Sequence, residues 1–383
     1  MASDLGGPPT LNSTWMCSYN MTAWEKQMEQ LYFWFYLLLF IPGLILNSTA
    51  LWVLCRHISK RNKAVIFMVN LALADLLHVL SLPLRIHYYW THTWPFGHEL
   101  CLLCFYLKYL NMYAAIAFLV CISVQRCLFL LKPFCARRWR QRYDLLISAT
   151  VWLVVGVCCS PFIIMRSSHS STNSSTNSST NSRPGCFKDL PVRKLPLSMA
   201  ATMMVLAELF GFVLPLGAIG YCSFRIVQSL KQCGLSDRKH TDSLNSSNHT
   251  PHSPVTSQHR PVSQTDRQTP SAKQTTGEKR RALRMVLSCS ALFLLCFAPY
   301  HINFLLYLMV SQGIVSLCPV VVAVRQFHPM SLCLASLSSC LNPLLYYFLT
   351  AEFRQHITNR TSSFSSSIRG RLMSLESTSS LRL

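Results

Sequence analysis

Three basic residues stand within otherwise apolar stretches of this chain: Arg85, Lys108 and Arg166. An ionisable side chain at membrane depth usually faces a cavity and marks a ligand or ion pathway. Arginine offers phosphate or carboxylate a planar fork of donors, and lysine offers a point charge. These bases therefore predict a pocket for an anion. The alternative for Arg85 and Arg166, which lie near the ends of their stretches, is that their charged groups extend to the membrane interface.

Tyrosines accompany the bases at helical spacing. Tyr89 follows Arg85 by four residues and Tyr113 follows Tyr109 by four, so each pair shares one face of a helix. With the bases, they predict an aromatic-lined pocket. An enzyme would need a nucleophile with its base or a metal cluster such as His-Glu-x-x-His, and no His in an apolar stretch has that spacing. We expect no catalytic residue, metal site or cofactor.

Seven apolar stretches must position these residues. Each is long enough to cross the roughly 30 Å hydrocarbon core of a bilayer as a helix. The predicted fold class is an all-α membrane protein, a seven-transmembrane helix bundle whose odd number of spans puts the termini on opposite sides. The predicted spans are 31–55, 65–90, 100–130, 144–165, 198–228, 282–310 and 321–349.

The chain is strongly basic, with a formal net charge of +21. In a soluble protein this charge would suggest nucleic acid as a partner. Here the charges are largely excluded from the apolar stretches and collect between them, so we expect a lipid bilayer around the chain and no nucleic acid. A transporter is the alternative from a different class, together with a membrane enzyme. Transporters tend to show inverted internal repeats, and we find none.

Loop charges predict the orientation, because short loops rich in Lys and Arg stay cytoplasmic. The loops 56–63 and 132–142 are rich in both, and 91–98 has neither. Asn12 and Asn20 begin glycosylation signals that make sense only outside the cell. We therefore expect a multi-pass plasma-membrane protein with an extracellular N-terminus and a cytoplasmic C-terminus.

Segments of biased composition divide the rest of the chain. We assign 1–30 to an extracellular tail, 31–358 to the membrane domain and 359–383 to a disordered, Ser-rich cytoplasmic tail. Within the membrane domain, 232–278 is predicted to be a disordered cytoplasmic loop. After the seventh span, 350–357 has the spacing of a short amphipathic helix lying at the cytoplasmic interface. The second extracellular loop repeats Ser-Ser-Thr-Asn and carries two glycosylation signals, at Asn173 and Asn177.

Four cysteines fall at extracellular positions, where disulfides form. They are Cys17, Cys101, Cys186 and Cys318. Four cysteines allow three pairings, and the sequence alone does not choose among them.

Each span also carries a residue or motif that is typical of one family of membrane proteins. They are Asn47, 71–75, Cys101 with Arg126, Trp152, Pro215, 296–299 and 342–346. With these residues in this order and at least one of them in every span, the chain resembles the rhodopsin-like (class A) G-protein-coupled receptors. The resemblance implies the pairings Cys101–Cys186 and Cys17–Cys318. It also implies a receptor that couples to a heterotrimeric G protein, with switch residues at Asp75, Arg126, Phe297, Pro299, Asn342 and Tyr346.

The closer resemblance is to the purinoceptor-like branch of that family. Segments 82–86, 104–113 and 297–301 are nearly the signature of its lysophosphatidylserine receptors. This resemblance adds Tyr300 and His301 to the predicted ligand-binding set of Arg85, Tyr89, Lys108, Tyr109, Tyr113 and Arg166.

The ligand predicted from this branch is an anionic lysophospholipid, most simply lysophosphatidylserine. Nucleotide-binding members commonly carry a base three residues after the His, and Phe304 stands there in this chain. A nucleotide is the alternative ligand. Glu208 in the fifth span has two explanations, contact with an ammonium group of the ligand or a partner that is either intrahelical or a tyrosine. The resemblance favours a Rho-activating G protein, with a stimulatory one second.

Two departures from the family concern the cytoplasmic end. The family's acidic-Arg-aromatic triplet reads Gln125-Arg126-Cys127, and Ser223 stands where a Tyr is frequent. Both predict altered basal activity without fixing its sign. The Ser-rich tail has two explanations, a plain linker or a phosphorylation cluster. For a receptor tail we favour the second, which implies receptor kinases and arrestin as further partners.

Overall fold

The computed structural model describes residues 22–56, 65–166, 186–187, 196–246, 270–311 and 313–349. Over these residues, every regular element is a helix. Seven helical stretches among them are long and apolar enough to cross a membrane. The predicted all-α, seven-span fold is thereby confirmed.

The first four spans are single helices. They are α1 (Thr22–Arg56), α2 (Val65–Thr91), α3 (His98–Leu131) and α5 (Gln141–Arg166). A short helix, α4 (Pro133–Arg138), follows α3 and was not predicted. Its first residue is a proline, which favours the first helical position because its fixed φ suits the helix and its missing N–H has no partner there.

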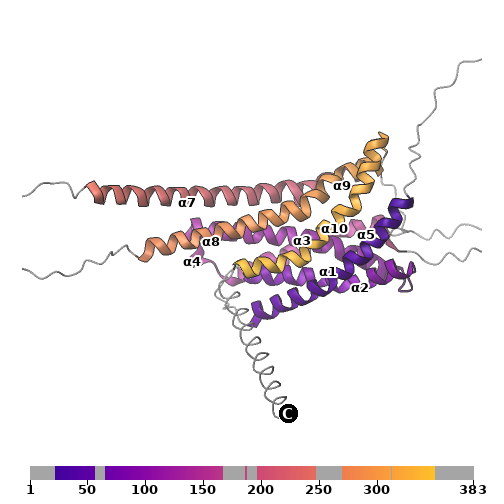
Figure 1. Cartoon of the computed structure of the whole chain (residues 1–383), viewed down its shortest axis with the longest axis horizontal. Helices are drawn as coiled ribbons and strands as arrows, with labels where there is room; N and C mark the ends of the chain where they lie inside the picture. Colours follow the sequence, from indigo (N-terminus) through magenta and orange to yellow (C-terminus); the bar gives the residue numbers. More distant parts are fainter. Residues whose placement is uncertain are drawn as a thin grey trace, which may run out of the picture.

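The fifth and sixth spans each contain one π-helical turn. The fifth consists of α6 (Leu197–Glu208), η2 (Leu209–Val213) and α7 (Leu214–Ser246). The sixth consists of α8 (Pro270–Leu292), η3 (Phe293–Phe297) and α9 (Ala298–Ser311), and the seventh is α10 (Cys318–Leu349). Figure 1 shows the spans packed side by side along the long axis of the molecule, with α7 and α8 extending at one end beyond their neighbours.

The two π-helical turns have a local cause in the prolines that follow them. Pro215 lacks an N–H and crowds the carbonyl of Gly211, and Pro299 does the same to Leu295. Both crowded carbonyls lie inside the π-helical turns. A proline removes a backbone hydrogen bond from a helix, and the wider turns are the form that the departure from regular helix takes here.

Several helix ends differ from the predicted spans. Helix α1 begins at Thr22 rather than near residue 31, and it buries Met28 in this added segment. Helices α7 and α8 reach Ser246 and Pro270, so they enter the 232–278 segment for which we expected disorder. Adding residues to an existing helix costs little compared with starting one, which accounts for these extensions. The predicted interfacial helix at 350–357 lies outside the described residues.

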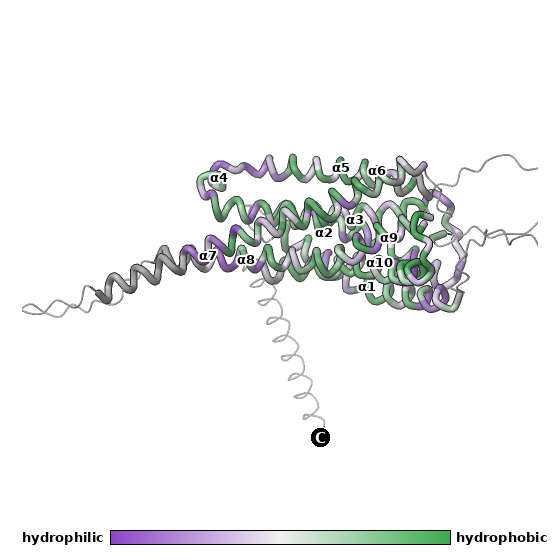
Figure 2. Tube along the Cα trace, turned by 90° about the horizontal axis from the view of Figure 1, so that it is seen from above, coloured by the Kyte–Doolittle hydropathy of each residue, from purple (hydrophilic) through white to green (hydrophobic). Residues whose placement is uncertain are grey.

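The interior of the bundle and its lipid-facing surface are both apolar. Phe118, Phe297 and Leu71 are fully buried in the main core, whereas Leu38 and Leu153 are 72% and 69% exposed. Figure 2 shows hydrophobic residues along the length of the bundle and hydrophilic residues gathered toward its two ends, among them those around α4. Exposed apolar side chains are expected on this surface because lipid tails are equally apolar.

Candidate ligand-binding site

Arg85 is buried in the outer half of the bundle rather than extended to the interface. The residue is 2% exposed, and its Nη2 donates a hydrogen bond to the carbonyl oxygen of Cys104 at 2.6 Å. The guanidinium carbon lies 4.6 Å from the ring centroid of Phe187 and 5.9 Å from that of Phe105. Over the part of the chain that the structure describes, no carboxylate forms an ion pair with it. Arg85 is therefore a buried cation held by aromatic faces and one carbonyl.

Lys108 approaches the same place from α3. Its Nζ donates a hydrogen bond to the hydroxyl of Tyr36 at 3.3 Å, and it lies 6.0 Å from the centre of that ring. The Arg85 guanidinium is also 6.0 Å from the Tyr36 ring. Helices α2 and α3 thus bring two predicted ligand-binding bases to one tyrosine of α1.

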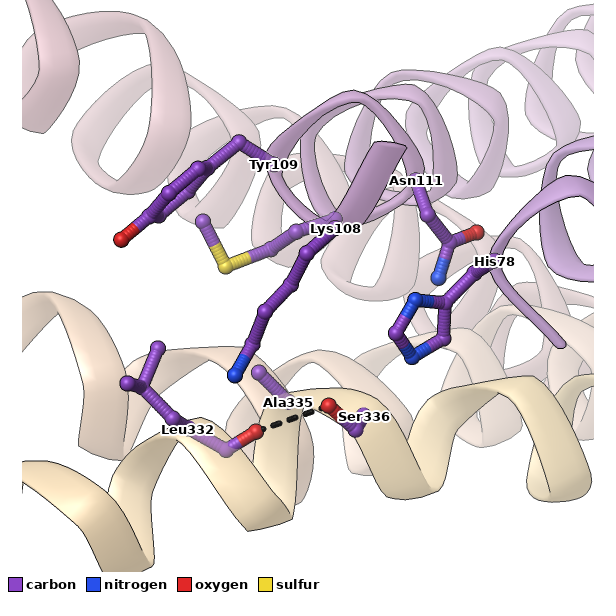
Figure 3. A pocket seen from close by; sticks show the side chains of 8 residues that line it. His78, Lys108, Tyr109, Asn111, Leu332, Ala335 and Ser336 are labelled. Atoms are coloured by element: carbon purple, nitrogen blue, oxygen red, sulfur yellow. Dashed lines mark hydrogen bonds between the residues drawn. The ribbon is translucent and has the colours of Figure 1, made fainter. Parts of the chain in front are cut away.

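A cavity opens beneath Lys108 (Figure 3). Its volume is about 10 Å³, roughly what one buried water needs. The Lys108 ammonium points toward α10, and the ring of His78 points into the space between α3 and α10. Neither ring nitrogen of His78 has a hydrogen-bond partner among the described residues. The lining residues are His78, Lys108, Tyr109, Asn111, Met112, Leu332, Ala335 and Ser336.

Phe187 covers this basic site because of the disulfide beside it. Cys186 is bonded to Cys101 at the outer end of α3, with their Cα atoms 6.0 Å apart. The Phe187 ring stacks on Tyr89 at 6.0 Å and contacts Tyr88 edge-on at 5.1 Å. We did not predict a role for Phe187, although its position next to Cys186, a predicted half-cystine, was a usable signal.

The remaining predicted ligand residues gather around His301, where α3 meets the fifth and sixth spans. The rings of Tyr113 and His301 are 5.8 Å apart, and those of Tyr300 and His301 are 5.2 Å apart. His301 Nδ1 lies 3.4 Å from Glu208 Oε1. The structure thus divides the predicted set into a group around Arg85 and Lys108 and a group around His301, with Tyr109 on the cavity wall.

Some predicted residues fall outside what the structure describes. Arg166 is the last residue of α5, and only its backbone is described, as is the case for Tyr346 in α10. Cys318 is disulfide-bonded, and Cys17, its expected partner, lies outside the described residues. The predicted Cys101–Cys186 bond is present. The four glycosylation signals also lie outside the described residues, so they stay predictions.

The predicted switch residues of the inner half form a polar contact across the bundle. Asn342 Nδ2 donates to both carboxylate oxygens of Asp75, at 3.2 and 3.0 Å, and both residues are fully buried. One turn earlier on α10, Ser339 accepts hydrogen bonds from two sides. Its carbonyl oxygen is 2.7 Å from Asn47 Nδ2, and its hydroxyl is 3.1 Å from Asn111 Nδ2. Helices α1, α2, α3 and α10 are linked by these contacts. Phe297 is fully buried in the sixth span.

The end of the bundle near α4 carries a carboxylate that we did not predict. Asp144 in α5 is fully buried, and its Oδ1 accepts from Gln125 Nε2 and from Trp139 Nε1, each at 2.7 Å. Arg126 follows Gln125 and is half-buried. An acid in the first turn of an apolar span was the available signal for Asp144. The sequence alone does not show that Asp144 would bond to Gln125, the residue that stands where the family has an acid.

Comparison with known proteins agrees with this geometry. Residues 46–346 match the family described as 7 transmembrane receptor (rhodopsin family). The chain is 50% identical to purinoceptor 10 of Homo sapiens over 356 residues, 93% of this chain and 91% of that protein. It is 42% identical to G-protein coupled receptor 174 of Homo sapiens over 325 residues, 85% and 84% of the two chains.

A third relative is lysophosphatidic acid receptor 6 of Homo sapiens, which is 31% identical over 342 residues, 89% of this chain and 86% of that protein. These relatives confirm the predicted resemblance to the purinoceptor-like branch. The chain therefore belongs to the rhodopsin family of seven-transmembrane receptors, which are multi-pass plasma-membrane proteins that couple to G proteins and are not enzymes.

Proposed function

We propose that this receptor is activated by an anionic lysophospholipid, with lysophosphatidylserine as its ligand. The observation that carries the proposal is the state of Arg85, which is buried and forms no ion pair over the described part of the chain. A buried charge without an opposite charge is costly, and a ligand phosphate would compensate it. Phe187 and the Cys104 carbonyl hold the guanidinium in one orientation, so its fork is ready for two phosphate oxygens.

Lys108 and Tyr36 supply the second part of the phosphate site. The Lys108 ammonium lies against the Tyr36 ring, which also faces Arg85. A phosphate between the two bases would contact donors from α2 and α3 together. Tyr89 and Tyr109 would then flank the headgroup, and Arg166 at the end of α5 would add positive charge at the outer rim.

A lipid is favoured over a nucleotide by the sixth span. Phe304, which stands where nucleotide-binding members commonly carry a base, stacks on Tyr300 with ring centres 5.4 Å apart. This surface suits an acyl chain better than a polyphosphate. The relatives' names point both ways, since one is named a lysophosphatidic acid receptor and another a purinoceptor. A nucleotide therefore stays in the test as the competing ligand.

Activation in this proposal is a shift between two packings of the helices. A ligand held by Arg85 and Lys108 would favour the packing in which the inner part of the sixth span moves outward and opens a cleft beside Arg126. A G protein of the Rho-activating class would enter the cleft, with a stimulatory one as the alternative. The N-terminus would be extracellular and the Ser-rich tail cytoplasmic, where receptor kinases and arrestin would bind it.

The test measures Rho activation and cyclic AMP in cells that express the full chain. Cells are dosed with lysophosphatidylserine, other lysophospholipids and nucleotides. We expect a response to lysophosphatidylserine that Arg85→Ala abolishes. The exposed Arg325 at the outer part of α10 supplies the matched control, since Arg325→Ala removes the same charge outside the pocket. A response to nucleotides with silence toward every lipid would overturn the ligand. An unchanged lipid response in Arg85→Ala would overturn the pocket.

A further inference from the structure

Glu208 is an acid inside an apolar span, and its environment is incomplete. It is the last residue of α6, its side chain is 17% exposed, and its Oε1 has no hydrogen-bond partner among the described residues. Acidic side chains at membrane depth are costly and usually face the bundle interior, where they have a function. Glu208 faces His301 of the sixth span, so it points inward rather than toward lipid.

His301 does not satisfy this carboxylate. The 3.4 Å separation between Nδ1 and Oε1 is within ion-pair range, yet the two atoms do not form a hydrogen bond. His301 is fully buried, and neither of its ring nitrogens has a hydrogen-bond partner over the described part of the chain. The hydroxyl of the fully buried Tyr300 has none there either. The carboxylate of Glu208, the imidazole of His301 and the phenol of Tyr300 therefore each have a donor or acceptor atom that makes no hydrogen bond within the described residues.

The π-helical turn η2 fixes this group in position. A Cβ atom on Gly211 would lie 2.5 Å from His301 Cε1 and 2.7 Å from Tyr113 Cε1, so only glycine allows this close approach. The next residue, Phe212, stacks on the His301 ring at 5.9 Å. Glu208 precedes Gly211 by three residues. The turn holds the His301 ring against the backbone at Gly211. The Glu208 carboxylate and the His301 imidazole therefore stay close together without a hydrogen bond between them.

The group and the basic site share helix α3. Tyr113 contacts His301, and it follows Lys108 by five residues, about 7.5 Å along the helix axis. The interior therefore carries basic groups at Arg85 and Lys108 and an acidic group at Glu208. A ligand that carries both a phosphate and a primary ammonium has matching charges, whereas lysophosphatidic acid lacks the ammonium.

We propose that Glu208, oriented by its contact with His301, is the subsite for the primary ammonium of the ligand headgroup. This inference rests on the proposed function and deepens it, because it makes Glu208 the residue that selects amino-lysophospholipids over lysophosphatidic acid. The ammonium donates to the carboxylate oxygen that has no partner within the described protein, and the charge-assisted bond forms away from bulk water.

The test compares lysophosphatidylserine with its analogue lacking the amine, both carrying the same acyl chain. Concentration–response curves for G-protein activation are recorded in cells expressing the full chain, with surface expression measured in parallel. Glu208→Gln keeps the shape of the side chain and removes the charge. We expect it to raise the half-maximal concentration of lysophosphatidylserine by about tenfold or more and to leave that of the analogue unchanged.

Two controls make the result specific. Glu99→Gln removes an exposed acid at the outer end of α3 and is expected to change neither curve. Glu208→Asp, which keeps the charge, is expected to recover part of the selectivity. An equal rise for both lipids in Glu208→Gln would show that the carboxylate only supports His301, and would overturn the subsite. A wild-type chain that is silent to both lipids would overturn the proposed function, and the subsite with it.

Discussion

The side-chain amide of Gln125 donates a hydrogen bond to Oδ1 of Asp144, with the two atoms 2.7 Å apart. The family's usual acid at the Gln125 position is thus absent from α3, but a buried carboxylate lies next to that position on α5. The Trp139 indole donates to the same oxygen. The end of α3, the start of α5 and the segment after α4 are therefore joined through one acid.

A charge exchange between these two residues tests the contact. Gln125→Glu sets two carboxylates against each other in a buried site, and we expect a loss of about 1–3 kcal/mol of stability. Asp144→Asn in the same chain removes the second charge and should restore most of the loss. The measurement is the thermal unfolding temperature of the receptor in detergent, read as a double-mutant cycle. Additive effects of the two changes would contradict the contact.

Gly211→Ala should destabilise the outer half of the fifth and sixth spans. The added methyl group would stand 2.5 Å from His301 and 2.7 Å from Tyr113, and such overpacking costs about 1–3 kcal/mol. Gly217→Ala is the matched control, because a Cβ on that helical glycine meets nothing within 4 Å. We expect a lower unfolding temperature for the first variant and an equal or higher one for the second. The same change in both would argue against the close packing at His301.

Phe187→Ala should weaken the response to the ligand without changing the maximal signal. The ring lies 4.6 Å from the Arg85 guanidinium, and removing it frees the guanidinium to rotate. Cation–π contacts of this kind are worth about 0.5–2 kcal/mol, which corresponds to a rise of roughly 2- to 30-fold in half-maximal concentration. Phe187→Tyr keeps the aromatic face and should behave like the wild type. Phe327→Ala, at an exposed position of α10, should have no effect on potency.

Asp75→Ala should cost more stability than Asp75→Asn. The alanine variant removes both oxygens that accept from Asn342 and leaves a buried amide without these acceptors, at a cost of about 1–3 kcal/mol. The asparagine variant keeps one carbonyl oxygen in place. Unfolding temperatures of the two purified variants decide the matter. If the alanine variant were as stable as the asparagine variant, the hydrogen bonds between α2 and α10 would contribute nothing measurable.

The sequence predicted the membrane spans well because a lipid bilayer allows few structures. A helix satisfies its own backbone, so hydropathy alone locates it. Arg85 and Lys108 could also be recognised as candidate site residues, since a charged side chain within an apolar stretch is costly and usually has a function. The structure brings both to Tyr36. That meeting depends on how three helices pack, which a single sequence does not specify.

Other features depend on contacts between distant parts of the chain. The partnership of Gln125 with Asp144 spans two helices, and the contact of Phe187 with Arg85 relies on a disulfide to α3. The π-helical turns were closer to being predictable. Pro215 and Pro299 indicated where the helices would change, but the form of the change depends on packing around Gly211 and Phe297.

The disulfide at Cys186 makes the position of Phe187 in the pocket independent of the length of the loop that precedes it. The chain between Arg166 and Cys186 contains the Ser-Ser-Thr-Asn repeat. Because Cys186 is bonded to α3, Phe187 keeps its place over Arg85 however many repeats precede it. The entropy of closing a loop grows only slowly with its length. Repeats can therefore be gained or lost, or replaced by a reporter peptide in an engineered receptor, without altering what the pocket recognises.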